Sequence, residues 1–84
     1  MNAVEIKNRI EALQNRAAKI VVTSDNKRNV QGIVDVIDSH MMSLEEILSD
    51  VRPERQADVL NEFNEELDDT EKTLVWHETK WGVA

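Results

Sequence analysis

The chain has 84 residues, of which 40% are hydrophobic and 32% are charged, and its net charge is −7. A chain this short buries only about 60% of the surface that its unfolded form exposes, so we expect a modest core and no deep enzyme cleft. It has no cysteine, which excludes disulfides and thiol nucleophiles. It also lacks a signal-like start and any run of about 18 apolar residues, so we expect one cytoplasmic domain, residues 1–84, with no membrane span.

Charge is distributed unevenly along the chain. Residues 1–28 hold six Lys and Arg against three acids, a net of +3, whereas residues 29–84 hold four against fourteen, a net of −10. Like charges slow encounter and opposite charges speed it. The acidic body therefore disfavours nucleic acid and favours a basic protein as partner.

The first predicted helix covers residues 3–22. Its apolar side chains alternate at steps of three and four residues, which is the spacing of a heptad seam on one helical face. The seam positions are Ala3, Ile6, Ile10, Leu13, Ala17 and Ile20.

Turn-forming residues at 23–26 lead into a second helix, predicted over residues 25–50 with Ser24 or Asp25 as its N-cap. Its apolar stripe is roughly 160° wide, so it should contact more than one neighbour and occupy the centre of the fold. The stripe consists of Val30, Ile33, Val34, Val36, Ile37, His40, Met41, Leu44, Ile47, Leu48 and Val51.

Pro53 interrupts this pattern, because proline donates no backbone hydrogen bond and drives Arg52 away from helical angles. Proline is well tolerated at the first position of a helix, and a third helix is predicted over residues 53–80. The alternative is one long rod kinked at Pro53, which would favour an intertwined dimer. The seam of the third helix is Leu60, Phe63, Leu67, Thr70, Leu74, His77 and Trp81.

These elements predict an all-α fold of three antiparallel helices with heptad-like packing, the second and third being longest. At about 1.5 Å per residue the first helix spans roughly 30 Å and the third up to about 42 Å, so part of the longer pair must overhang. We expect the overhang to expose Leu74, His77 and Trp81, and exposed apolar surface commonly marks association. The sequence therefore predicts a homodimer with these three residues at its interface.

Five carboxylates recur along the third helix at steps of four, four, three and four residues, which places them on one face nearly opposite the seam. We call them the acidic stripe: Glu54, Asp58, Glu62, Glu65 and Asp69. Like charges at this spacing repel by roughly 0.2–0.5 kcal/mol per pair, so the stripe costs helix stability. Two interpretations stay open: a face that only confers solubility, and a docking surface for a basic protein.

The same outward face continues with Lys72, Trp76 and Lys80. A tryptophan among charges on the solvent side is typical of a binding surface, because it buries a large area at small entropic cost. The alternative is a tryptophan covered by the lysine stems or by a second copy of the chain.

The cations of the first 28 residues have two possible uses. Salt bridges to a neighbouring helix are the expected one, and only flank acids such as Glu66 or Glu71 come within reach of Arg9 or Arg16. The alternative is an anion or phosphate contact at the start of the second helix. It would combine Arg9, Arg16, Lys19, Lys27 and Arg28.

The only histidines, His40 and His77, fall on or beside apolar seams. They lack the i, i+4 spacing of a two-histidine metal site and the Glu-x-x-His motif of di-iron bundles. We expect core or interface histidines and no metal or cofactor. No nucleophile motif supports catalysis.

The sequence thus predicts a binding protein rather than an enzyme. The first hypothesis is a small acidic interaction module, an inhibitor or accessory factor, that docks the acidic stripe and Trp76 on a basic, for example nucleic-acid-handling, protein. Its size and charge suit a phage factor acting on host machinery. The second hypothesis is a structural protein that acts by coiled-coil self-association. The third is a nucleic-acid accessory protein that uses the basic first helix and loop.

Overall fold

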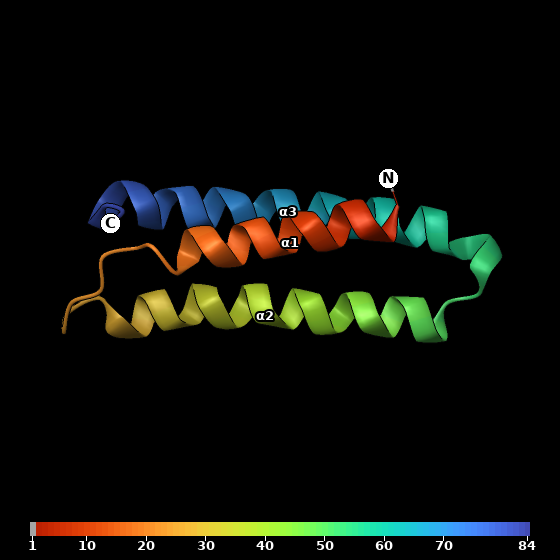
Figure 1. Ribbon diagram of the computed structural model, residues 1–84, viewed down its shortest axis with the longest axis horizontal. Helices are drawn as coiled ribbons and strands as arrows, with labels where there is room; N and C mark the ends of the chain where they lie inside the picture. Colours follow the sequence, from red (N-terminus) through yellow and green to blue (C-terminus); the bar gives the residue numbers. More distant parts are fainter. Residues whose placement is uncertain (1) are drawn as a thin grey trace.

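The structure is a computed structural model that describes residues 2–84. It consists of three helices, α1 over Ala3–Ala17, α2 over Lys27–Asp50 and α3 over Pro53–Trp81. They pack side by side into a rod of 46 × 17 × 16 Å (Figure 1). Residues 2–84 contain no β-strand beyond one isolated bridge. The predicted all-α fold of three packed helices is confirmed.

Successive helices run in opposite directions along the rod, so α1 and α3 point the same way (Figure 1). The contacts between α1 and α3 agree with this direction: Arg9 reaches Asp68, and Arg16 reaches Glu78 further along both helices. The α1–α2 connection and the end of α3 therefore lie at one end of the rod, and the α2–α3 turn lies at the other.

The core is built from the predicted seams. Each fully buried Ile, Leu or Phe side chain contributes about 1.5–3 kcal/mol, so these contacts hold the helices together. The buried apolar residues are Ile6, Ile10, Leu13, Ala17, Ile20, Val30, Ile33, Ile37, Leu44, Leu60, Phe63, Leu67 and Leu74.

The first helix ends at Ala17, and the prediction that it continues to residue 22 is wrong. Ile20 instead forms a β-bridge with Val83, and the backbone N–H of Val21 donates to the Gly82 carbonyl at 3.0 Å. The run Ile20-Val21-Val22 is β-branched, which lowers helix propensity and favours an extended backbone. The residues that follow α3 supply the pairing partner for this extended stretch.

The second helix begins at Lys27, and the cap residue is Asn26 rather than Ser24 or Asp25. Asn26 is 1% exposed. Its side chain makes no cap hydrogen bond to α2 but accepts from the Thr23 N–H at 2.7 Å and donates to the Val21 carbonyl at 2.8 Å. The Asn26 side chain therefore holds together the backbone of the connection between α1 and α2.

Pro53 marks a turn, and the alternative of a single kinked rod is wrong. Val51 (φ −88°, ψ 132°) and Arg52 (φ −59°, ψ 143°) are extended between the two helices. Pro53 then occupies the first position of α3, as predicted, and Gln56 donates back to the Val51 carbonyl at 3.0 Å. At its other end α3 runs to Trp81, one residue beyond the prediction.

The expectation that Leu74, His77 and Trp81 form an exposed overhang is also wrong. Leu74 is 0% exposed and His77 8%. Trp81 packs against the core. The 18–26 connection crosses this end of the rod and buries Ile20 there, whereas α1 stops short of the α2–α3 turn (Figure 1). The overhang therefore lies at the opposite end, because helix lengths alone do not determine which ends are aligned.

Candidate functional site

All five carboxylates of the acidic stripe are exposed, as the helical spacing predicts. None of them takes part in an ion pair with any residue from 2 to 84. The opposite side of α3 carries the buried side chains of Leu60, Phe63 and Leu67. From Glu54 to Asp69 the outer face of α3 therefore carries exposed negative charges that no ion pair within residues 2–84 neutralises.

A second set of acids on α3 faces α1 and is neutralised by it. Arg9 donates to Asp68 Oδ1 at 2.6 Å and to Glu71 Oε1 at 3.1 Å. Arg16 donates to Glu71 Oε2 at 2.9 Å, and it binds Glu78 through two nitrogens at 2.7 and 3.3 Å. We call Asp68, Glu71 and Glu78 the ion-pair flank. The predicted contact of Glu71 with Arg9 and Arg16 is confirmed, but Glu66, the other candidate, pairs with neither arginine and acts on His40 instead. The contacts of Asp68 and Glu78 were not predicted.

The ion-pair flank shifts the pKa values of its members. Hydrogen bonds from Arg16 and Arg9 hold the pKa of Glu71 below its ordinary value. Burial lowers the pKa of Arg9, but the hydrogen bonds and charges of Asp68 and Glu71 outweigh it and raise that pKa overall. The charged forms are thus favoured on both sides of the α1–α3 contact.

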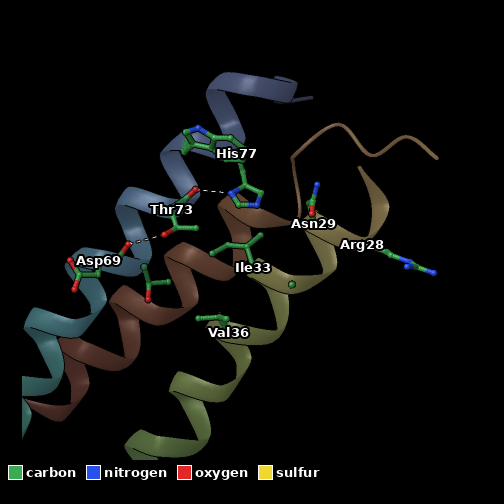
Figure 2. A pocket seen from close by; sticks show the side chains of 10 residues that line it. Arg28, Asn29, Ile33, Val36, Asp69, Thr73 and His77 are labelled. Atoms are coloured by element: carbon green, nitrogen blue, oxygen red, sulfur yellow. Dashed lines mark hydrogen bonds between the residues drawn. The ribbon is translucent and has the colours of Figure 1, made fainter. Parts of the chain in front are cut away.

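The predicted anion contact is not assembled. Arg9 and Arg16 are engaged by the ion-pair flank, whereas Lys19, Lys27 and Arg28 are exposed. Arg28 lies at the start of α2 and extends away from α3 (Figure 2). Two of the five cations are therefore already paired with carboxylates of α3.

Trp76 is 53% exposed on the outer face of α3, as predicted. Its ring stands edge-on to His77 and Trp81, with centroid distances of 5.1 and 5.6 Å. The ammonium of Lys80 lies 4.8 Å from the Trp76 ring centroid, so the expected lysine contact is also present. Trp76 is therefore an exposed but supported ring, which suits a binding anchor.

An open groove of about 590 Å³ runs between α2 and α3, next to the acidic stripe. We call it the α2–α3 groove. Figure 2 shows Ile33 and Val36 extending from α2 toward α3. Its other lining residues include Gly32 of α2 and Asp69, Thr73 and Trp76 of α3. The sequence analysis singled out Val36, Asp69 and Trp76 for other reasons, but it did not predict that they border one groove.

His40 links α2 to α3, whereas the hydrogen bond and ring contacts of His77 lie within α3. His40 Nε2 lies 2.7 Å from the Thr70 hydroxyl, and its ring stands edge-on to Phe63. Burial lowers the pKa of His40, and the charge of Glu66 partly opposes this. His77 Nδ1 donates to the Thr73 carbonyl at 2.7 Å (Figure 2). In the described part of the chain no three His, Asp or Glu side chains are grouped to hold a metal ion.

Within residues 2–84, no helix has the length and apolar character needed to cross a membrane. No known protein family matches the chain, and neither does any curated protein or solved structure.

Proposed function

We propose that this protein is a small acidic interaction module, acting by binding rather than catalysis, whose acidic stripe and Trp76 dock on a basic surface of another protein. An inhibitor or accessory factor of a nucleic-acid-handling protein fits this description. The single observation that carries the proposal is the contrast between the two sets of acids on α3. The ion-pair flank is neutralised by α1, whereas the acidic stripe is exposed and has no cation partner within residues 2–84.

The acidic stripe lowers helix stability, which supports a role for it other than in folding. Its neighbours lie three or four residues apart, so each adjacent pair costs roughly 0.2–0.5 kcal/mol of helix stability. A basic partner would relieve this repulsion and would be steered to the stripe by its field. The exposed Trp76 lies on the same face, two helical turns beyond Asp69, and supplies the apolar contact area that charges alone lack.

The test compares two triple variants of equal net charge. The stripe variant carries Asp58→Asn, Glu62→Gln and Glu65→Gln. The control variant carries Glu11→Gln, Glu45→Gln and Glu46→Gln, three exposed acids on α1 and α2 that make no ion pair in residues 2–84.

Each variant and the wild type would be used to capture partners from an extract of the native host, followed by mass spectrometry. We expect the wild type and the control variant to capture the same protein, and the stripe variant to lose it. Equal capture by the stripe and control variants would overturn the proposal, because the position of the charges would then be irrelevant.

Self-association is a second candidate, supported by a different surface. Leu48 is 43% exposed near the end of α2, and Val51 and Val59 close to the α2–α3 turn are only partly buried. A second copy packing on this end would bury them. Sedimentation equilibrium of the wild type and of Leu48→Glu tests this: a dimer that the variant converts to a monomer supports it, and a monomeric wild type overturns it.

A further inference from the structure

We propose that the α2–α3 groove receives the apolar face of a cationic amphipathic helix from the partner protein, which would pack against the rod as a fourth helix. This inference rests on the proposed function, because it names the segment that the acidic surface would recognise. It is carried by the groove's shape, by a glycine that the fold itself does not require, and by the charge along one rim.

The size and lining of the α2–α3 groove suit the binding of apolar side chains. Its volume of about 590 Å³ falls within the range of ordinary binding pockets, and Ile33, Val36 and Trp76 provide apolar walls. Val36 is 45% exposed and Trp76 53%, although both are large apolar residues. Two neighbouring helices with an apolar channel between them match the way in which amphipathic helices are bound.

Gly32 lines the α2 side of this groove and, having no side chain, leaves space there. Glycine in a helix interior costs stability relative to alanine, because it loses more backbone freedom on folding. A Cβ placed on Gly32 would meet no atom within 4 Å, so no close approach inside the chain requires the glycine. Its effect is to keep the groove open beside Val36, where a partner helix could approach closely.

The α3 rim identifies the charge of the occupant. Asp69 lines the groove, and Glu65 and Glu62 follow it on the same exposed face. The opposite end of the groove carries cations instead, because Arg28 lines it there and Lys80 lies over Trp76 at 4.8 Å. The fitting helix therefore places an apolar anchor against Trp76 and Val36, and cations about two turns away against the carboxylates.

The probe is a pair of synthetic 18-residue helical peptides that differ on one face. Both carry the same lysines and arginines, but one has leucines on the opposite face and the other has alanines. Binding to the full chain is measured by titration, and amide shifts of Gly32 and Thr73 report the site. Gly32→Leu fills the groove and leaves the acidic stripe intact, and Gly32→Ala is its folding control, expected to raise the thermal midpoint.

We expect the leucine peptide to bind the wild type at least about tenfold more tightly than it binds Gly32→Leu. The alanine peptide should not distinguish the two proteins. Equal affinity of the leucine peptide for wild type and Gly32→Leu overturns the inference. A Gly32 resonance that moves with protein concentration alone also overturns it, because the occupant would then be a second copy.

The stripe variant separates this inference from the proposed function. If the stripe variant loses the leucine peptide and Gly32→Leu retains it, the groove inference fails and the acidic docking surface stands. If Gly32→Leu loses the peptide and the stripe variant retains it, the carboxylates do not contribute to binding. A cationic partner is then contradicted, and both proposals are overturned. Loss of binding in both variants supports the two proposals together.

Discussion

Arg16 donates to Glu71 across the contact between α1 and α3, with Arg16 Nη1 2.9 Å from Glu71 Oε2. Arg9 binds the other carboxylate oxygen of Glu71 at 3.1 Å, so a single acid joins two cations that lie two helical turns apart on α1. Glu65, earlier on the same helix, is exposed and has no such partner within the part of the chain described. The two glutamates therefore provide a matched comparison.

Replacing Glu71 by Gln should lower the free energy of unfolding by about 1 kcal/mol, because hydrogen bonds to charged groups are lost at a partly exposed site. Replacing Glu65 by Gln should leave stability unchanged or raise it by roughly 0.2–0.5 kcal/mol, because only repulsion is removed. Urea denaturation of both variants measures the difference. Equal losses in the two variants would contradict the assignment of the two sets of acids.

His40 should make stability depend on pH. Burial lowers its pKa below 6.5 in the folded protein, so the unfolded chain binds more protons than the folded one as the pH falls. Its full contribution is therefore present above about pH 6.5 and is lost as the pH falls through the folded-state pKa. Thr70 and Glu66 are the groups that face it from α3.

Thermal midpoints of the wild type and His40→Asn, measured between pH 8 and pH 5, test this dependence. The wild type should lose more stability than the variant over this interval, because Asn does not titrate. Parallel curves would show that His40 has the same pKa in both states. Using the difference between the two proteins removes every contribution that is common to both.

Asn26 should matter more than the residues that sequence rules favour as caps. Its buried side chain holds the Thr23 N–H and the Val21 carbonyl, so Asn26→Ala leaves two polar groups without their partner and should cost about 1–3 kcal/mol. Ser24→Ala is the control, since Ser24 is exposed and should change stability by less than about 0.5 kcal/mol. A larger loss for Ser24→Ala would contradict the structure of this connection.

Leu74 should behave as a core residue and not as an interface residue. Because it is 0% exposed, Leu74→Ala should lower the free energy of unfolding by about 2–5 kcal/mol and leave the oligomeric mass of the remaining folded protein unchanged. Denaturation and sedimentation together measure both effects. A variant of wild-type stability that dissociates into smaller species would restore the interface that the structure does not support.

Much of the fold followed from the sequence because heptad spacing directly reports which side chains face inward. The buried apolar residues of all three helices lie at predicted seam positions, although Val36 and Leu48 of the α2 apolar stripe are exposed. The missing N–H of Pro53 predicted an interruption there, but the sequence left a turn and a kink both open. The stripe and Trp76 were predicted to be exposed for the same reason, since they lie opposite the seam of α3.

What the sequence could not supply was the alignment of the helices with one another. The end of α1 depends on the pairing of Ile20 with Val83, which is more than sixty residues away and invisible to local propensity. Leu74, which helix length alone placed in an overhang, is 0% exposed. The sequence did not predict the α2–α3 groove, because the missing side chain of Gly32 contributes to a groove only when α3 is packed beside α2.

The most direct measurement of the central claim is the affinity of the captured partner for the wild type, the stripe variant and the control variant at low and high salt. The account predicts that the stripe variant weakens binding at least about tenfold and flattens its salt dependence, whereas the control variant stays within about threefold of the wild type. Equal affinities and equal salt dependences for the two triple variants would contradict it.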